Sequence, residues 1–199
     1  MSSSVRTEYT EDTRQQILGA AQRCFVRNGL HGTSMADVAK ESGLTEEDVA
    51  RHFADRDDLV NGIAENILRL IAGFFEEIRR EDPIPPLDEV VARFSRTVID
   101  FSGSDGPGRL TPIYWASALY NEEMAERAKA PIAESRAGWV EIAERERAAG
   151  NLAAGTDPQA VGTTLVSLVP GILLQHILFG DVDAGVFSRG IRDLLESSR

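Results

Sequence analysis

The sequence predicts an all-α protein of about nine helices. Three observations lead to this fold class. Apolar residues recur at intervals of three and four along most of the chain, which is the spacing that lines one face of a helix. Breaks rich in glycine and proline divide the chain into segments of helical length. No stretch of useful length alternates between apolar and polar residues, so we predict no strand.

The first predicted element is a helix from Thr10 to Asn28. Residues 1–9 lack periodicity, so we expect a flexible tail before it. The hydroxyl of Thr10 can cap the helix, and Gly29 can adopt the left-handed conformation that ends it. Between these two signals, the following apolar residues share one face: Ile17, Leu18, Ala21, Cys24 and Phe25.

Two short helices follow, and both begin with the same signature. Ser34-x-x-Asp37 and Thr45-x-x-Asp48 are capping boxes, in which the hydroxyl and the carboxylate each accept a hydrogen bond from a backbone N–H at the helix start. Gly43 separates the two helices, because glycine tolerates the positive φ that a tight turn requires. The two helices are therefore predicted to meet at a sharp bend.

This pair of helices is the sequence form of a helix-turn-helix, which places its second helix in the major groove of DNA. Val49 and Phe53 lie four residues apart and predict the apolar face that holds the second helix in place. Hydroxyl, guanidinium and helix N-terminal groups contact phosphates, and carboxylates can accept from cytosine. The candidate DNA-binding residues are Thr33, Ser34, Thr45, Glu46, Glu47, Asp48, Arg51, His52 and Arg56.

Charge opposes DNA binding and leaves two alternatives open. The formal net charge is −11, and residues 1–60 hold seven basic and eleven acidic residues, a difference of −4. Glu46, Glu47 and Asp48 either stabilise the helix N-terminus or present a carboxylate to cytosine N4. Arg51 and the hydroxyl residues either contact phosphates or serve only as solvated charge and helix caps. DNA binding must therefore depend on local geometry.

The remaining chain predicts further helices separated by marked breaks. Residues 82–86 form the strongest break, because proline lacks an N–H donor and restricts its predecessor. Residues 103–108 and 150–157 are predicted loops, and Pro131 predicts a kink or a break in a long helix. The expected helices are, in order, 55–80, 87–101, 109–119, 121–149, 158–179 and 184–197.

The composition predicts a folded chain in the cytoplasm. Hydrophobic residues make up 42% of the 199 residues, which is enough to pack a core. The single cysteine, Cys24, excludes an internal disulfide and is expected to be a buried thiol. We find no secretory signal. The most apolar window, 165–179, is too short for a bilayer and contains Pro170, Gln175 and His176, so we expect no membrane span.

Several short motifs are spaced as in a known family. Phe25 is followed four positions later by Gly29, and residues 32–34 are a glycine followed by two hydroxyl residues. A Val-Ala-x-x-Ser-Gly turn occupies residues 38–43. A His-Phe pair at 52–53 is followed by an Arg-acid-x-Leu run at 56–59. With these anchors in register, residues 14–60 resemble the tetracycline-repressor-like (TetR) family of bacterial transcriptional regulators.

The resemblance implies a three-helix helix-turn-helix head, residues 1–56, on a helical ligand-binding and dimerisation domain, residues 57–199. It implies a ligand-responsive repressor that a small apolar or amphipathic effector releases from a pseudo-palindromic double-stranded DNA operator. Two positions depart from the pattern: Ala50 stands where the family commonly has a phosphate-contacting tyrosine, and Glu46 and Glu47 stand where it often has basic or small residues. A ligand-binding or protein-interaction dimer that has lost ordinary DNA binding is therefore the alternative.

We expect no enzymatic activity, metal or cofactor. The three histidines, His31, His52 and His176, are far apart in the sequence and lack the spacing of metal ligands. No Ser-His-Asp arrangement can be argued, and the glycine-rich run at 103–108 lacks the preceding strand of a phosphate-binding loop.

The later helices contain residues suited to an effector pocket and to a dimer interface. The apolar arc of 158–179 is wide enough to need partners on two sides, and 184–197 has a matching stripe. We therefore expect a homodimer through both helices, the alternative being a helix central within one subunit. Tyr114, Trp115 and His176 are the preferred pocket residues, because each pairs apolar bulk with a polar tip. The full set of ligand-binding candidates is Phe74, Phe94, Phe101, Tyr114, Trp115, Trp139, Ile172, Gln175 and His176.

Overall fold

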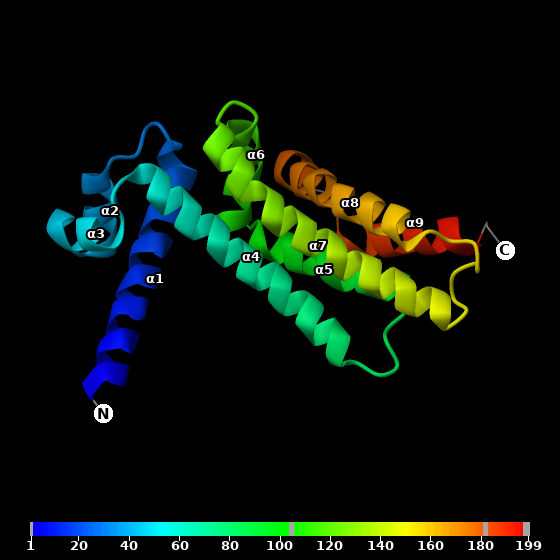
Figure 1. Ribbon diagram of the computed structural model, residues 1–199. Helices are drawn as coiled ribbons and strands as arrows, with labels where there is room; N and C mark the ends of the chain where they lie inside the picture. The colour runs from blue at the N-terminus through cyan, green and yellow to red at the C-terminus, as the bar shows by residue number, and fades with distance from the viewer. Residues whose placement is uncertain (1, 104–105, 181–182, 197–199) are drawn as a thin grey trace. The chain divides into compact units, whose positions relative to one another are not determined.

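The computed structural model describes residues 2–103, 106–180 and 183–196, and for residues 2–10 and 196 it describes the backbone alone. Within these ranges the regular secondary structure is helical, which confirms the all-α fold class (Figure 1). The chain forms two compact units, Met1–Ile67 and Leu68–Arg199, whose boundary falls inside α4. The first unit is called the head below, and the second is called the C-terminal unit.

The head consists of three helices and the first half of a fourth. The helix α2 packs against both α1 and α3, and the three lie together in Figure 1. The apolar faces predicted for these helices meet in one core, with Ile17, Leu18, Ala21, Cys24, Phe25, Val38, Ala39, Val49, Phe53, Leu59 and Ile63 buried. The bounds are α1 Ser2–Asn28, α2 Met35–Ser42, α3 Glu46–His52 and α4 Arg56–Arg80.

Both predicted capping boxes are confirmed. The Ser34 hydroxyl accepts from the Asp37 N–H at 3.1 Å, and the Asp37 carboxylate accepts from the Ser34 N–H at 2.9 Å. Thr45 and Asp48 repeat this exchange at distances of 3.1 and 3.4 Å. Gly43 has φ 73°, the left-handed conformation that ends α2 and turns the chain toward α3. Local chemistry therefore fixes both ends of the turn.

The flexible tail predicted for residues 1–9 is wrong where the structure describes it. The helix α1 begins at Ser2, so Thr10 lies inside a helix and does not cap it, and Met1 lies outside the described residues. No glycine or proline occurs between residues 2 and 12, so nothing in the sequence ends the helix there. The predicted end is confirmed, because Gly29 follows Asn28 with φ 74°.

The C-terminal unit contains the rest of α4 and five further α-helices. The helix α7 packs against α8, α5 packs against α9, and α6 packs against both α7 and α8. One prediction needs correction, because the helix expected over 109–119 begins with a 3-10 turn, η1. For Pro131 a kink or a break was expected, and α7 continues through this residue, so there is no break, while the kink stays a prediction. The predicted last residue, 197, lies outside the described residues. The bounds are α5 Leu87–Phe101, η1 Pro107–Leu110, α6 Thr111–Ala118, α7 Glu122–Ala148, α8 Pro158–Phe179 and α9 Ala184–Glu196.

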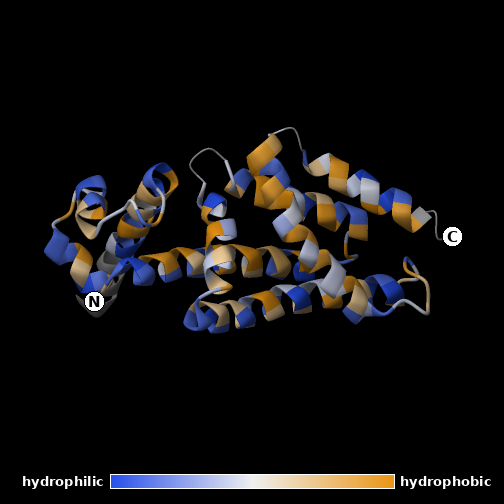
Figure 2. Cartoon of the chain, turned by 90° about the horizontal axis from the view of Figure 1, so that it is seen from above, coloured by the Kyte–Doolittle hydropathy of each residue, from blue (hydrophilic) through white to orange (hydrophobic). Residues whose placement is uncertain are grey.

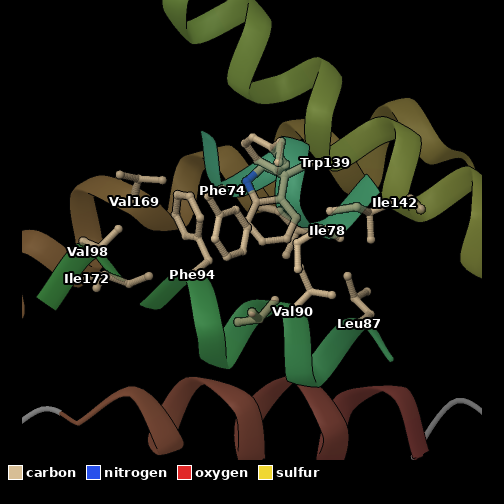
Figure 3. Packing of buried hydrophobic residues seen from close by; sticks show 14 of the residues in the cluster. Phe74, Ile78, Leu87, Val90, Phe94, Val98, Trp139, Ile142, Val169 and Ile172 are labelled. Carbon is tan, nitrogen blue, oxygen red and sulfur yellow. The ribbon is translucent and has the colours of Figure 1, made fainter. Parts of the chain in front are cut away.

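Aromatic side chains from three helices meet in the core of this unit. Trp139 of α7 contacts Phe75 of α4 edge-on, with ring centroids 5.4 Å apart, and Phe94 of α5 at 5.1 Å. Phe74 lies 5.1 Å from Phe94, and Figure 3 shows these rings beside Val169 and Ile172 of α8. Edge-to-face packing of this kind adds to the gain from burial. The cluster joins α4, α5, α7 and α8.

A buried carboxylate caps α5 from a distant helix. The N-cap residue of α5 is Pro86, which offers no side-chain hydrogen bond. Glu146 of α7 supplies the missing acceptor, because its Oε2 accepts from the Leu87 N–H at 3.1 Å. Its Oε1 accepts from the Asn151 side chain at 3.0 Å, and only 2% of Glu146 is exposed. The charge is thus satisfied by two hydrogen bonds, and the two helices are tied together.

The helices α8 and α9 leave apolar side chains uncovered within one chain. Of the described helices, α8 alone is long and apolar enough to cross a membrane, but only 28% of its most apolar window is buried. Length and composition alone are weak support for a span, since a core or interface helix passes the same test. Figure 2 shows hydrophobic and hydrophilic residues alternating along α9. The exposed apolar residues of the two helices are Leu174, Leu178, Phe179, Val186 and Leu194.

Candidate nucleic-acid interface and ligand-binding residues

The helix α3 is buried on one face and open on the other. Val49 is 0% exposed and Phe53, its C-cap residue, is 2% exposed, so both anchor the helix in the head core as predicted. Four residues of the opposite face are exposed, and they are Glu46, Glu47, Ala50 and Arg51. This exposed face is what α3 can present to a partner such as a DNA groove.

The cation on this face is already paired with acids of the same helix. Arg51 Nη2 donates to Glu47 Oε1 at 2.6 Å, and Nη1 donates to Asp48 Oδ1 at 3.0 Å. The side chain is 64% exposed, and its hydrogen bond to Glu47 is the main cause that raises the pKa of Arg51. Because surface ion pairs are weak, a phosphate can compete for this guanidinium.

The two capping aspartates are committed to the fold of the head. The Asp48 carboxylate accepts from the Thr45 hydroxyl at 2.6 Å, and this bond is the main cause that lowers the pKa of Asp48. The Ser34 hydroxyl lowers the pKa of Asp37 in the same way, at 2.6 Å. Helix capping therefore accounts for Asp48, whereas Glu46 and Glu47 take no part in the box.

Two further DNA-binding candidates, Thr33 and Arg56, have structural partners in the head. Thr33 is buried and its hydroxyl donates to the Gly29 carbonyl at 3.0 Å. Arg56 is half-buried and donates to the Leu30 carbonyl at 3.2 Å, which ties the start of α4 to the loop after α1. His52 is half-buried at the end of α3. A direct role of these residues on DNA stays a prediction.

Sequence reasoning missed a cluster of charges between α1 and α2. Arg23 Nε donates to Glu41 at 2.7 Å, and Arg27 Nη2 donates to the other oxygen of the same carboxylate at 2.5 Å. These bonds, Arg23 first, lower the pKa of Glu41. The partners are 18 and 14 residues apart in the sequence, so no local pattern could have revealed them.

The structure brings four of the nine ligand-binding candidates together. Phe74, Phe94, Trp139 and Ile172 belong to the same buried cluster, and Trp115 packs partly buried against it. The outcome is consistent with a pocket wall, but it is also what ordinary core packing produces. Their role toward a ligand therefore stays a prediction.

The other four candidates lie outside this buried cluster. Gln175 is exposed, and Phe101, Tyr114 and His176 are half-buried. The Tyr114 hydroxyl donates to the Met124 carbonyl at 3.5 Å, and burial raises the pKa of Tyr114. Of the three preferred residues, Tyr114 thus has a backbone partner for its polar tip.

Three buried polar atoms of the C-terminal unit have no hydrogen-bond partner among the described residues. They are Trp139 Nε1, Thr111 Oγ1 and His176 Nδ1. Buried hydroxyls elsewhere in the unit are satisfied: Ser95 donates to the Val91 carbonyl at 2.7 Å. Thr111 was missed at the sequence level. The signal for it is weak, since a threonine before Pro112 at a helix start reads as a boundary residue.

The head matches a known family model. Residues 17–63 match the model described as bacterial regulatory proteins, tetR family. The matched range covers the second part of α1, the two helices of the turn and the beginning of α4.

Curated relatives differ in how much of the chain they match and in their sequence identity to it. The chain is 22% identical to the transcriptional regulator TtgR of Pseudomonas putida, over 87% of this chain and 84% of that protein. It is 26% identical to the regulator BetI of Stenotrophomonas maltophilia over 59% of this chain and 60% of that protein. It is 40% identical to the regulator AcrR of Shigella flexneri, but over 28% of this chain and 26% of that protein.

Solved structures share the whole fold. Salmonella enterica GusR has a TM-score of 0.74 at 22% identity, covering 94% of both chains. The transcriptional regulator FadR from Bacillus subtilis, solved in complex with stearoyl-CoA, has a TM-score of 0.71 at 16% identity, covering 91% of this chain and 96% of that one. At these identities the likeness concerns the fold. Taken with the family match and the curated relatives, it shows that the chain is a helix-turn-helix transcriptional regulator of the TetR family of bacterial regulatory proteins.

Proposed function

We propose that this regulator is a homodimeric repressor that binds a pseudo-palindromic DNA operator and leaves it when a small effector binds the C-terminal unit. The observation that carries the proposal is the geometry of α3. The helix is capped by Thr45, anchored through Val49 and Phe53, and exposed on the opposite face. A short, rigid helix held this way suits insertion into a major groove.

The exposed face of α3 suggests how the operator would be read. Glu46 and Glu47 lie in the first turn, where recognition helices meet base edges. A carboxylate accepts from cytosine N4, whereas guanine offers only acceptors on its major-groove edge. Arg51, freed from Glu47, would contact a phosphate. Because the head carries few unpaired cations, we expect weak non-specific binding.

The uncovered face of α8 and α9 supports the homodimer. Leu178 is 69% exposed and Phe179 is 70% exposed at the end of α8, and Leu194 is 69% exposed on α9. Large apolar side chains gathered on two adjacent helices are typical of a protein interface. A homodimer formed through this face would carry two copies of α3, as a pseudo-palindromic operator requires. A cytoplasmic location follows from binding DNA.

The C-terminal unit offers an apolar interior for the effector. Its aromatic cluster around Trp139 is built from three helices, and the Trp139 Nε1 inside it has no hydrogen-bond partner among the described residues. Apolar walls with few polar groups suit small-molecule binding. An effector shifts the equilibrium only by binding one arrangement of the dimer more tightly than the other.

A second candidate is a dimer of the same fold that has lost ordinary DNA binding. One specific observation favours it: Arg51 is held by Glu47 and Asp48, and Ala50 offers no polar group beside it. In this alternative α3 would be a solvated or protein-binding surface.

Selection of bound sequences from a random DNA pool, followed by a salt titration, separates the two candidates. The repressor should select an inverted repeat, and replacing Arg51 with Ala should flatten the slope of log affinity against log salt by about one. The Glu47→Gln variant should bind more tightly than wild type at low salt, because it frees Arg51. If no sequence is enriched and no fragment binds at low salt, the DNA-binding proposal fails and the alternative stands.

A further inference from the structure

The indole of Trp139 is enclosed by aromatic rings and leaves its donor unused. The residue is 1% exposed, with ring centroids of Phe74, Phe75 and Phe94 at 6.5, 5.4 and 5.1 Å. Its Nε1–H has no hydrogen-bond partner among the described residues, and Figure 3 shows it inside the cluster (blue atom). A buried donor without an acceptor costs stability, so its retention calls for an explanation.

A second unused polar group lies on a neighbouring element. Thr111 is 9% exposed at the junction of η1 and α6, and its hydroxyl has no partner in the described part of the chain. Ser95 and Ser102, also buried, donate to the carbonyls four residues earlier at 2.7 and 2.6 Å. The Thr111 hydroxyl makes no such bond, because Thr111 is the first residue of its helix.

The two groups, and a third on α8, belong to elements that pack on one another. The helix α6 packs against α7, which carries Trp139, and against α8, which carries the unpartnered His176 Nδ1. The helices α7 and α8 also pack together, and Figure 1 shows α6 beside the end of α8. Unsatisfied polar atoms thus occur on three mutually packed helices of an otherwise apolar core.

The charge content of this region limits what could satisfy them. The buried polar side chains of the C-terminal unit are hydroxyls and a single carboxylate, Glu146, in the described residues. That carboxylate is already bound by the Leu87 N–H and by Asn151. The core cluster that surrounds Trp139 consists of apolar residues. A charged ligand group inside this cluster would be desolvated among apolar side chains, which is costly.

We infer that the Trp139 N–H and the Thr111 hydroxyl form the polar anchor of the effector site, and that the effector is an uncharged, largely apolar molecule carrying a hydrogen-bond acceptor. A carbonyl or ether oxygen of the effector would accept from the Trp139 N–H while its apolar body contacts the aromatic rings, and the Thr111 hydroxyl offers a second donor. Neither a carboxylate nor an ammonium ion fits. This inference rests on the proposed effector function and specifies the chemical class of ligand.

Three probes of nearly equal size test the class directly. They are 2-acetylnaphthalene, which carries a neutral acceptor, 2-ethylnaphthalene, which carries none, and 2-naphthoate, which is charged. The full-length protein should bind the ketone about five-fold more tightly than the hydrocarbon, the worth of a net hydrogen bond, and the carboxylate most weakly. Tight binding of the carboxylate would overturn the inference.

Two variants, each lacking one donor, locate the anchor. Trp139→Phe removes the N–H and keeps an aromatic ring, and Thr111→Val is isosteric and removes the hydroxyl. Trp139→Phe should reduce the preference for ketone over hydrocarbon toward one, Thr111→Val should reduce it less, and both should leave hydrocarbon binding within about two-fold. Thr97→Val is the matched control for the threonine variant, because it deletes the same group from a half-buried threonine whose hydroxyl already donates to the Arg93 carbonyl at 3.1 Å, and it should leave the preference unchanged.

The NMR signal of the Trp139 indole N–H reports hydrogen bonding to the ligand directly. A purely structural role of Trp139 would leave this signal unchanged when the ketone is added. The chain has two tryptophans, so Trp115→Phe assigns the Trp139 N–H signal. In the wild-type protein the ketone should move this signal downfield, as hydrogen bonding does, and the hydrocarbon should not. The inference is overturned if the preference survives both variants, if the indole signal is unmoved, or if none of the probes binds. Operator selection with the same preparations reports separately whether the regulator function stands.

Discussion

The head and the C-terminal unit satisfy their polar groups in opposite ways. In the head, Ser34 and Thr45 find partners three residues away, and Arg51 finds them three and four residues away. In the C-terminal unit, Glu146 bonds a backbone group 59 residues away. Other buried polar atoms there have no partner in the described residues.

Their apolar groups differ as well. The head buries both apolar anchors of α3, whereas α8 and α9 leave leucines and a phenylalanine exposed. The helix-turn-helix of the head is therefore largely specified by its own local sequence, although Glu41 pairs with Arg23 and Arg27 at longer range and Asn61 Oδ1 is buried without a partner in the described residues. The C-terminal unit is completed by long-range contacts, and we propose that a second copy and a ligand supply the rest.

The largest predicted effect breaks a long-range contact of the C-terminal unit. Glu146→Ala should lower the free energy of unfolding by about 3 kcal/mol, because the buried Leu87 N–H and the Asn151 side chain both lose a charged acceptor. Chemical denaturation measures the loss. Glu144→Ala, at an exposed position on the same helix, should change stability by less than about 0.5 kcal/mol. Equal effects from the two variants would show that the buried carboxylate does not tie α5 to α7.

The next prediction concerns the uncovered face of α8. Leu178→Glu should weaken self-association by about 30-fold or more, because it places a carboxylate in an apolar interface. Sedimentation equilibrium of the purified protein measures the change. Leu119→Glu, at a residue that is 79% exposed in the turn before α7, is the control and should leave association unchanged. An unaltered dimer in the Leu178→Glu protein would place the interface elsewhere.

A smaller effect is expected from a helix cap in the head. Thr45→Ala should destabilise α3 by about 1 kcal/mol, because the Asp48 N–H loses its acceptor. Hydrogen exchange of that amide reports the change. Thr45→Ser keeps the hydroxyl and should restore protection. If serine and alanine behave alike, the capping box does not hold α3.

The smallest effect is a dependence on pH at low pH. Thr45 and Ser34 lower the pKa values of Asp48 and Asp37, so the folded head binds protons less readily than the unfolded chain. The stability they contribute is fully present above the unfolded pKa of about 3.9 and is lost as pH falls through the lowered folded values. Asp48→Asn should be less stable than wild type at about pH 6 and converge with it at about pH 2. If the free energies of unfolding of the two proteins ran parallel across this pH range, the capping account of Asp48 would be contradicted.

The difference between the two units also explains what the sequence could predict. The capping boxes, Gly43 and the buried pair Val49 and Phe53 are encoded within a few residues, and the structure confirms each of them. The first helix was placed eight residues too late because the absence of a breaker, rather than the presence of a cap, decides its start at Ser2.

The candidate site of the C-terminal unit was only partly predictable. Aromatic residues could be named, and the structure clusters Phe74, Phe94 and Trp139. Periodicity does not reveal which buried polar atom lacks a hydrogen-bond partner. Thr111 was therefore not among the predicted ligand-binding residues, and Tyr114 was a preferred one. The cap that Glu146 supplies to Leu87 was also invisible, since it joins residues far apart in the sequence.

The central claim, that a dimer presents two copies of α3 to one duplex, can be measured as a distance. The native thiol, Cys24, is buried, and burial raises its pKa, so Ala50→Cys provides one reactive thiol per chain on the exposed face of α3. Nitroxides attached there should show a single narrow distance of roughly 34–36 Å between the two chains on selected operator DNA, one turn of the double helix. The distribution should broaden or shift when an effector releases the DNA. Absence of a dipolar signal on bound DNA, or a distance that no multiple of the helical turn can accommodate, would contradict the account.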